Sequence, residues 1–194
     1  MENSLLMRTE ASSALNFLVY IQNIFLNQNR SEEEYRFPYI PSKYIVKEKF
    51  ELRFKELWDE VTQRLSEHPK NDMKIFYEEK DLFHQRLFTG GNESLKEYSE
   101  IHQTFKVWWD SFAGRFSVER AIDEKSQKLY EELANFLTQR EIVPQKELNI
   151  SLVYDEFPLG NLEVSSLFAV VSIKDVFVKY KELMAKLQKL FWNK

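Results

Sequence analysis

The sequence predicts a predominantly helical α+β fold, in which amphipathic helices pack with a small antiparallel sheet. Apolar residues recur at three- and four-residue steps over most of residues 4–141, which is the period of a helix with one buried face. Two short segments near the C-terminus, 148–154 and 162–173, are instead rich in β-branched residues. An all-α helical bundle is the alternative, because residues 162–191 can also form one long helix.

The N-terminal third is expected to contain two helices joined by an extended connector. Residues 4–28 and 43–67 both place their apolar side chains on one helical face. Between them, Pro38 and Pro41 push the residues that precede them into extended geometry. His68, followed by proline, marks the end of the second helix.

The middle of the chain contains one ambiguous segment and two further helices. In residues 73–88, two apolar runs flank a charged stretch, which suits a hairpin, although the segment can also form a helix. Ser94 and Glu97 then have the spacing of a capping box, which predicts a helix from residue 94 to about 115. Gly114 indicates a break before another helix that runs to about residue 141.

The β-branched segments 148–154 and 162–173 are separated by residues 157–161, which contain Pro and Gly. This arrangement predicts an antiparallel pair of strands around a turn, to which residues 74–88 could add. Ser172 and Asp175 then repeat the capping-box pattern and predict the start of a last helix.

Length, charge and composition favour a single globular domain, residues 1–194, in the cytoplasm. No repeat or linker divides the chain, and 194 residues suffice for one sizeable core. The net charge is −4 and acids alternate with bases, so we expect no nucleic-acid partner. No apolar run approaches the roughly 20 residues of a membrane span, and no export signal is visible, so we expect no membrane association. The absence of cysteine excludes disulfides and thiolate chemistry.

No metal site or cofactor site is predicted. The three histidines, His68, His84 and His102, lack the spacing that places two ligands on one helix face. The Gly90-Gly91 pair lacks the further glycines and the Lys-Ser or Lys-Thr pair of a phosphate-binding loop, so it is interpreted as a turn. We therefore assign no catalytic, metal or cofactor-binding residue.

One enzymatic alternative remains open. An apolar strand that ends in Glu78-x-Lys80, with an upstream acid such as Asp59 or Asp72, is the skeleton of metal-dependent nucleases. In such sites the carboxylates hold a divalent cation and the lysine orients the attacking water. The alternative function is therefore a divalent-metal-dependent hydrolase or nuclease.

The chain is unusually aromatic, with 16 Phe, nine Tyr and four Trp. Rings in excess of the needs of a core supply contact area at interfaces, although they can also clamp the connector onto the core. Because the aromatic residues are in surplus and no catalytic, metal or cofactor motif is present, we expect a non-catalytic protein. Such a protein would act through contacts with a protein partner or with a second copy of itself. The candidate interface residues are Tyr35, Phe37, Tyr39, Trp108, Trp109 and Trp192.

Overall fold

The computed structural model describes residues 5–28, 35–41, 44, 46–144, 146–161, 163–165 and 167–191. Helices account for most of this part of the chain, and strands lie near both of its ends. The elements are β1 (Met7–Ala11), α1 (Ser13–Gln28), α2 (Phe50–Glu67), α3 (Asn71–Met73), η1 (Lys74–Glu78), α4 (Asp81–Leu87), α5 (Asn92–Trp109), η2 (Phe112–Phe116), α6 (Ser117–Ala121), α7 (Asp123–Gln139), β2 (Leu148–Val153), β3 (Glu163–Ser165), β4 (Phe168–Ser172), α8 (Ile173–Phe177) and α9 (Tyr180–Lys189).

The strands form a sheet in the order β1-β2-β4-β3. β1 is parallel to β2, and β2 is parallel to β4, whereas β3 pairs antiparallel with β4. The predominantly helical α+β class is confirmed, but the prediction of an antiparallel sheet from 148–173 is wrong. After β2 the chain returns along β3 and reverses just before β4, where Leu167 adopts a φ of 68°. β4 therefore lies between β2 and β3 and runs in the same direction as β2.

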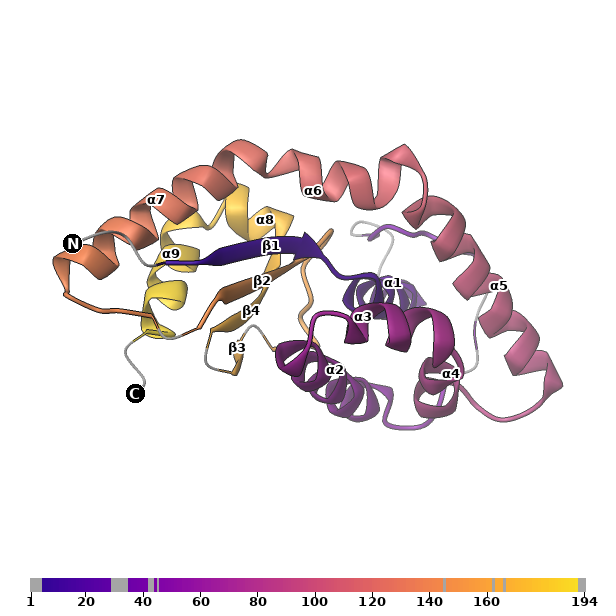
Figure 1. The fold of residues 1–194 in the computed structure, drawn as a ribbon. Helices are drawn as coiled ribbons and strands as arrows, with labels where there is room; N and C mark the ends of the chain where they lie inside the picture. Colours follow the sequence, from indigo (N-terminus) through magenta and orange to yellow (C-terminus); the bar gives the residue numbers. More distant parts are fainter. Residues whose placement is uncertain are drawn as a thin grey trace.

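The helices divide into two groups beside the sheet (Figure 1). Helices α1 to α4 gather at one end of the sheet, and α8 and α9 lie against its other part. The run of α5, η2, α6 and α7, which is kinked at Gly114, arches over the molecule and joins the two groups. β2 and β4 are buried on both faces almost throughout, as expected for parallel strands covered by helices.

Helix α1 is the centre of the helical group, because residues 13–24 are all buried. A helix that is buried on every side must satisfy its polar side chains internally. Asn16 donates to the Leu152 carbonyl at 2.8 Å and accepts from the Tyr154 amide at 2.9 Å, which ties α1 to β2. The ring of Phe17 contacts aromatic rings of η1, α4 and α5, which joins the helical group around one cluster.

Several predicted boundaries change in the structure. The helix predicted over 4–28 begins only at Ser13, because β1 precedes it. The helix predicted over 43–67 begins at Phe50. Residues 74–88 are helical and form no hairpin, and β3 and β4 exclude a single helix over 162–191.

The two predicted capping boxes have different outcomes. At the start of α8, Ser172 Oγ accepts from the Asp175 amide at 3.0 Å, so the serine half of this box is confirmed. The Asp175 carboxylate accepts from the Ser172 hydroxyl at 2.7 Å and not from its backbone amide. The Ser94 cap is wrong: α5 begins two residues earlier, at Asn92, after Gly91 with a φ of 121°. Within the described residues, no helix is long and apolar enough to cross a membrane.

Candidate functional site

One face of the sheet carries two rows of side chains that the strand register places side by side. Arg8 on β1 is in register with Asn149 on β2, which is in register with Phe168 on β4. Glu10 and Ser151 form the next row, because alternate residues of a strand point to the same face. The opposite face of β1 meets α7, where the Thr9 and Ser126 hydroxyls lie 3.2 Å apart. The polar rows therefore lie on the face that α7 does not cover.

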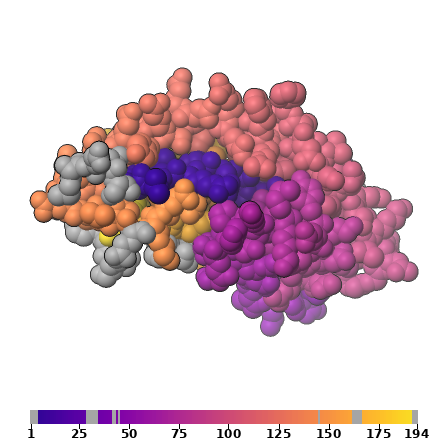
Figure 2. Space-filling view, viewed as in Figure 1, coloured from indigo at the N-terminus to yellow at the C-terminus, as the bar shows by residue number. Residues whose placement is uncertain are grey.

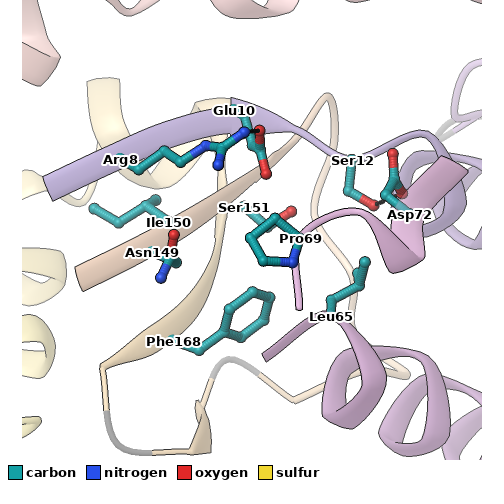
Figure 3. Close-up of a pocket in the computed structure, with 10 residues that line it drawn as sticks. All are labelled: Arg8, Glu10, Ser12, Leu65, Pro69, Asp72, Asn149, Ile150, Ser151 and Phe168. Atoms are coloured by element: carbon teal, nitrogen blue, oxygen red, sulfur yellow. Dashed lines mark hydrogen bonds and ion pairs between the residues drawn. The ribbon is translucent and has the colours of Figure 1, made fainter. Parts of the chain in front are cut away.

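These rows form the floor of a small hollow whose other wall comes from the helical group (Figure 3). Leu65 near the end of α2 and Pro69 after it lie over the strands, while Asp72 in α3 lies at the edge of the hollow beside Ser12. Its cavity volume is about 10 Å³, the space of roughly one water molecule. In the space-filling view, β1 reaches the surface between the arch above and helices α2 to α4 below (Figure 2).

The hollow combines a charged pair with one buried hydrogen-bond acceptor that has no partner in the described residues. Arg8 Nη2 and Glu10 Oε2 lie 2.7 Å apart, with side chains 49% and 32% exposed, so both can reach a molecule from solvent. The side-chain oxygen of Asn149 is buried and accepts no hydrogen bond in the described residues. A buried acceptor without a partner is uncommon in proteins and favours a polar ligand or a water molecule at this point.

Asp72 has a different role in the same hollow. Its carboxylate accepts from the Ser12 hydroxyl at 2.5 Å and from the Ser13 and Ala14 amides at 2.9 Å each. These bonds fix the first turn of α1 against α3. Asp72 therefore positions the wall of the hollow, whereas the Glu10 carboxylate pairs with Arg8 and is partly exposed.

The histidines do not converge on the hollow. The rings of His84 and His102 lie 5.3 and 6.1 Å from the ring of Tyr98, between α4 and α5. Burial lowers the pKa of both histidines. His68 is exposed after α2, where its Nδ1 accepts from the Lys70 amide at 3.1 Å. Within the described residues, no group of three or more His, Asp or Glu side chains is arranged to hold a metal ion.

The nuclease skeleton is not present. The segment that contains Glu78 is helical rather than a strand, and the side chains of Glu78 and Lys80 are exposed. Asp59 is exposed on α2, and Asp72 is engaged by the N-terminus of α1. The acids that this hypothesis requires are therefore not gathered around one cation site.

The aromatic residues singled out from the sequence are distributed between core and surface. Tyr35, Phe37 and Tyr39 are 43%, 50% and 57% exposed, while Trp108 is half-buried against Tyr20 and Phe37. Trp109 is buried, and its indole donates to Ser13 Oγ at 3.0 Å. Trp192 lies outside the described residues. Contact of these rings with a partner stays a prediction.

Residues 43–136 match the family described as rhaM, L-rhamnose mutarotase. The match covers slightly less than half of the 194 residues and spans helices α2 to α6 and most of α7. No curated protein and no solved structure matches the chain.

This similarity corrects the expectation of a non-catalytic protein that acts through protein contacts. A mutarotase is a catalyst of sugar isomerisation, so the match points to enzymatic function. The scarcity of His and Cys does not amount to an absence of catalytic groups. Proton transfer on a sugar requires neither residue, because carboxylates also act as general acids and bases.

Sequence reasoning missed the residues of the hollow because it assigned the first of them to a helix. Arg8 and Glu10 alternate with Thr9 and Ala11, and Asn149 and Ser151 alternate with apolar residues on β2. This period of two was the available signal. A period of two shows which residues of one strand share a face. It does not show that β1 and β2 are neighbours in the same sheet.

Proposed function

We propose that this protein catalyses the interconversion of the anomers of a reducing monosaccharide, with the hollow over β1 and β2 as its site. The proposal rests on one observation: the segment that matches the mutarotase family borders the polar face of the sheet. Leu65, Pro69 and Asp72 belong to the segment that resembles L-rhamnose mutarotase, and they form one wall of a hollow whose floor is polar.

The size of the hollow determines how a sugar binds. A space for one water molecule accepts one hydroxyl group, so the sugar ring lies across the mouth of the hollow with a single hydroxyl inside. The free oxygen of Asn149 accepts a hydrogen bond from that hydroxyl. Arg8 and Glu10, which are partly exposed at the mouth, then contact the anomeric centre.

Mutarotation needs one proton to move from the anomeric hydroxyl to the ring oxygen. The Glu10 carboxylate takes the hydroxyl proton as the bond between the anomeric carbon and the ring oxygen breaks, which gives the open-chain aldehyde. The former ring oxygen carries negative charge after the bond breaks, and Arg8 donates a hydrogen bond to this oxygen. Glu10 then delivers the proton to the same oxygen. Rotation about the bond next to the aldehyde and reversal of these steps close the other anomer. Each proton that Glu10 takes up is returned to the sugar, so the enzyme ends in its starting state and the sugar keeps all of its atoms.

The test is the rate of anomer exchange of L-rhamnose, measured by NMR saturation transfer with and without the purified protein. We expect a rate above that of buffer that rises in proportion to protein concentration. Glu10→Gln should lower the protein-dependent rate by about a hundredfold, the range of a lost general base. Glu93→Gln, an exposed acid on α5, is the matched control and should retain the full rate.

One outcome tests whether the protein has the activity, and another tests whether the hollow is the site of that activity. A rate equal to that of buffer, for both L-rhamnose and D-glucose, would overturn the proposed function. Protein-dependent exchange that is unchanged in Glu10→Gln and Asn149→Ala would place the chemistry elsewhere and overturn the assignment of the hollow.

A further inference from the structure

A second concave surface lies between the first half of α7 and the turn that joins α8 to α9. Figure 1 shows α7 passing beside these two helices. The groove is open and has a volume of about 460 Å³, which is within the range of sites for small organic ligands. It shares no lining residue with the hollow over β1 and β2. Among the described residues that line it are Lys125 and Lys128 of α7 and Phe177, Val178, Lys179 and Lys181 of the segment from α8 to α9.

The groove is positively charged although the chain as a whole is acidic. Four lysines and one glutamate line it, while the net charge of the protein is −4. Lys128 pairs with Glu132 at 3.6 Å, and Lys179 pairs with Glu156 at 3.0 Å. Within the described residues, Lys125 and Lys181 have no ion-pair partner closer than 4 Å. These two ammonium groups are therefore available to an anion that enters the groove.

The same groove exposes apolar surface beside the lysines. Phe177 is 51% exposed and Val178 is 70% exposed. Lys128 also lies over the ring of Tyr180, 5.2 Å from its centroid, so a cationic and an aromatic group are in contact in the lining. Burial of the exposed ring and methyl groups by a ligand is favourable, because it removes apolar area from water.

We propose that this groove binds an amphipathic organic anion, a small molecule with an aromatic or aliphatic body and a sulfonate, carboxylate or phosphate group. The apolar body covers Phe177 and Val178, and the anionic group pairs with Lys125 and Lys181. The concave shape favours a small molecule that can enter it over a flat lipid surface. This site is independent of the sugar chemistry proposed for the hollow.

The test uses the fluorescent probe anilinonaphthalene sulfonate, which combines an aromatic body with one sulfonate. We expect saturable fluorescence enhancement with one probe per folded chain. Binding should weaken about tenfold in the double variant Lys125→Glu/Lys181→Glu, because attraction by two lysines becomes repulsion. Phe177→Ser should weaken binding as well. Raising the salt concentration should weaken binding to the native protein, because ions screen the lysine charges of an open groove.

Matched controls distinguish this groove from a general response to charge. Lys186→Glu/Lys189→Glu changes two exposed lysines of α9 that do not line the groove, and it should leave binding unchanged. Glu10→Gln should also leave probe binding unchanged, whether or not the hollow catalyses mutarotation. Non-saturable enhancement, no response to added salt, or equal losses in both lysine variants with melting temperatures unchanged would each overturn the proposal.

Discussion

The carboxylate of Asp72 accepts a hydrogen bond from the Ser12 hydroxyl at 2.5 Å, although 60 positions separate the two residues in the sequence. Ser12 Oγ in turn accepts from the Leu15 amide at 3.1 Å. Together with the bonds from the Ser13 and Ala14 amides to Asp72, this arrangement satisfies the first free amides of α1. A side chain from α3 thus caps the central helix of the molecule.

Removal of this cap should destabilise the whole helical group. We expect Asp72→Ala to lower the free energy of unfolding by about 2 kcal/mol, because buried amide donors lose their acceptor. Asp72→Asn keeps the shape and one acceptor oxygen and should cost less. Urea unfolding followed by circular dichroism measures both variants. Equal stability of Asp72→Ala and the native protein would show that the cap does not stabilise α1.

The contrast between the two capping boxes explains how far the sequence predicts local structure. The Ser172–Asp175 cap forms because β4 ends at Ser172, which leaves this serine in extended geometry as the residue before the helix. Ser94 instead lies inside α5, where its Oγ is 3.4 Å from His84 Nε2 on α4. A contact between helices decides that position, and local spacing does not encode such a contact.

The same limit applies to the sheet and to the candidate site. The β-branched composition predicted one strand over 148–154 and one over 162–173, but the second segment forms two strands, β3 and β4. β2 and β4 are neighbours in the sheet. The composition could not predict that they run parallel, because this depends on β3 carrying the chain back. Nor could it pair Arg8 with Asn149, which lie in register only because β1 joins the sheet from the other end of the chain.

Gly160 should tolerate no side chain, because it lies against the ring of Trp58. A Cβ at Gly160 would lie 2.6 to 2.9 Å from ring atoms of Trp58, which is fully buried and stacked on Phe157. We expect Gly160→Ala to lower the free energy of unfolding by about 1 to 3 kcal/mol, the usual cost of overpacking. Gly90 has nothing within 4 Å of its Cβ position and provides the matched substitution. Similar urea midpoints for the two alanine variants would contradict the close packing of Gly160.

Glu156 should stabilise the fold at neutral pH and lose this effect in acid. Hydrogen bonds from Lys174 and Lys179, at 2.9 and 3.0 Å, lower the pKa of Glu156 from 4.5 to about 2, and Arg36 lies 3.6 Å away. Because the folded pKa is below the unfolded one, the stabilisation is complete above about pH 5 and is lost as the pH falls toward about 2.

The variant that tests this stabilisation by Glu156 is Glu156→Gln. At about pH 6 it should be less stable than the native protein by about 1 to 2 kcal/mol, after allowance for partial exposure of the group. The difference should shrink as the pH is lowered to about 3, as measured by urea midpoints across that range. Glu93→Gln, on the exposed face of α5, should show no such convergence. A constant difference at every pH would mean that packing, and not charge, explains the effect.

His102 should contribute a pH dependence in the neutral range. Its ring stacks on Phe76 with centroids 4.9 Å apart, and its Nε2 is buried without a hydrogen-bond partner in the described residues. Burial is the main cause that lowers its pKa from 6.5, and the nearby Lys80 and Lys106 act in the same direction. The unfolded chain therefore binds a proton at a higher pH than the folded protein does.

Stability should consequently fall as the pH drops below about 6.5, because protonation favours the unfolded state there. His102→Phe keeps a ring in the cluster and should flatten this dependence. The pKa of His84 is lowered too, so the double variant with His84→Phe should be flatter still. His68→Gln, at an exposed position, is the control and should retain the native slope. Thermal melting between about pH 7.5 and about pH 5 measures all four proteins, and an unchanged slope in His102→Phe would show that this ring does not resist protonation.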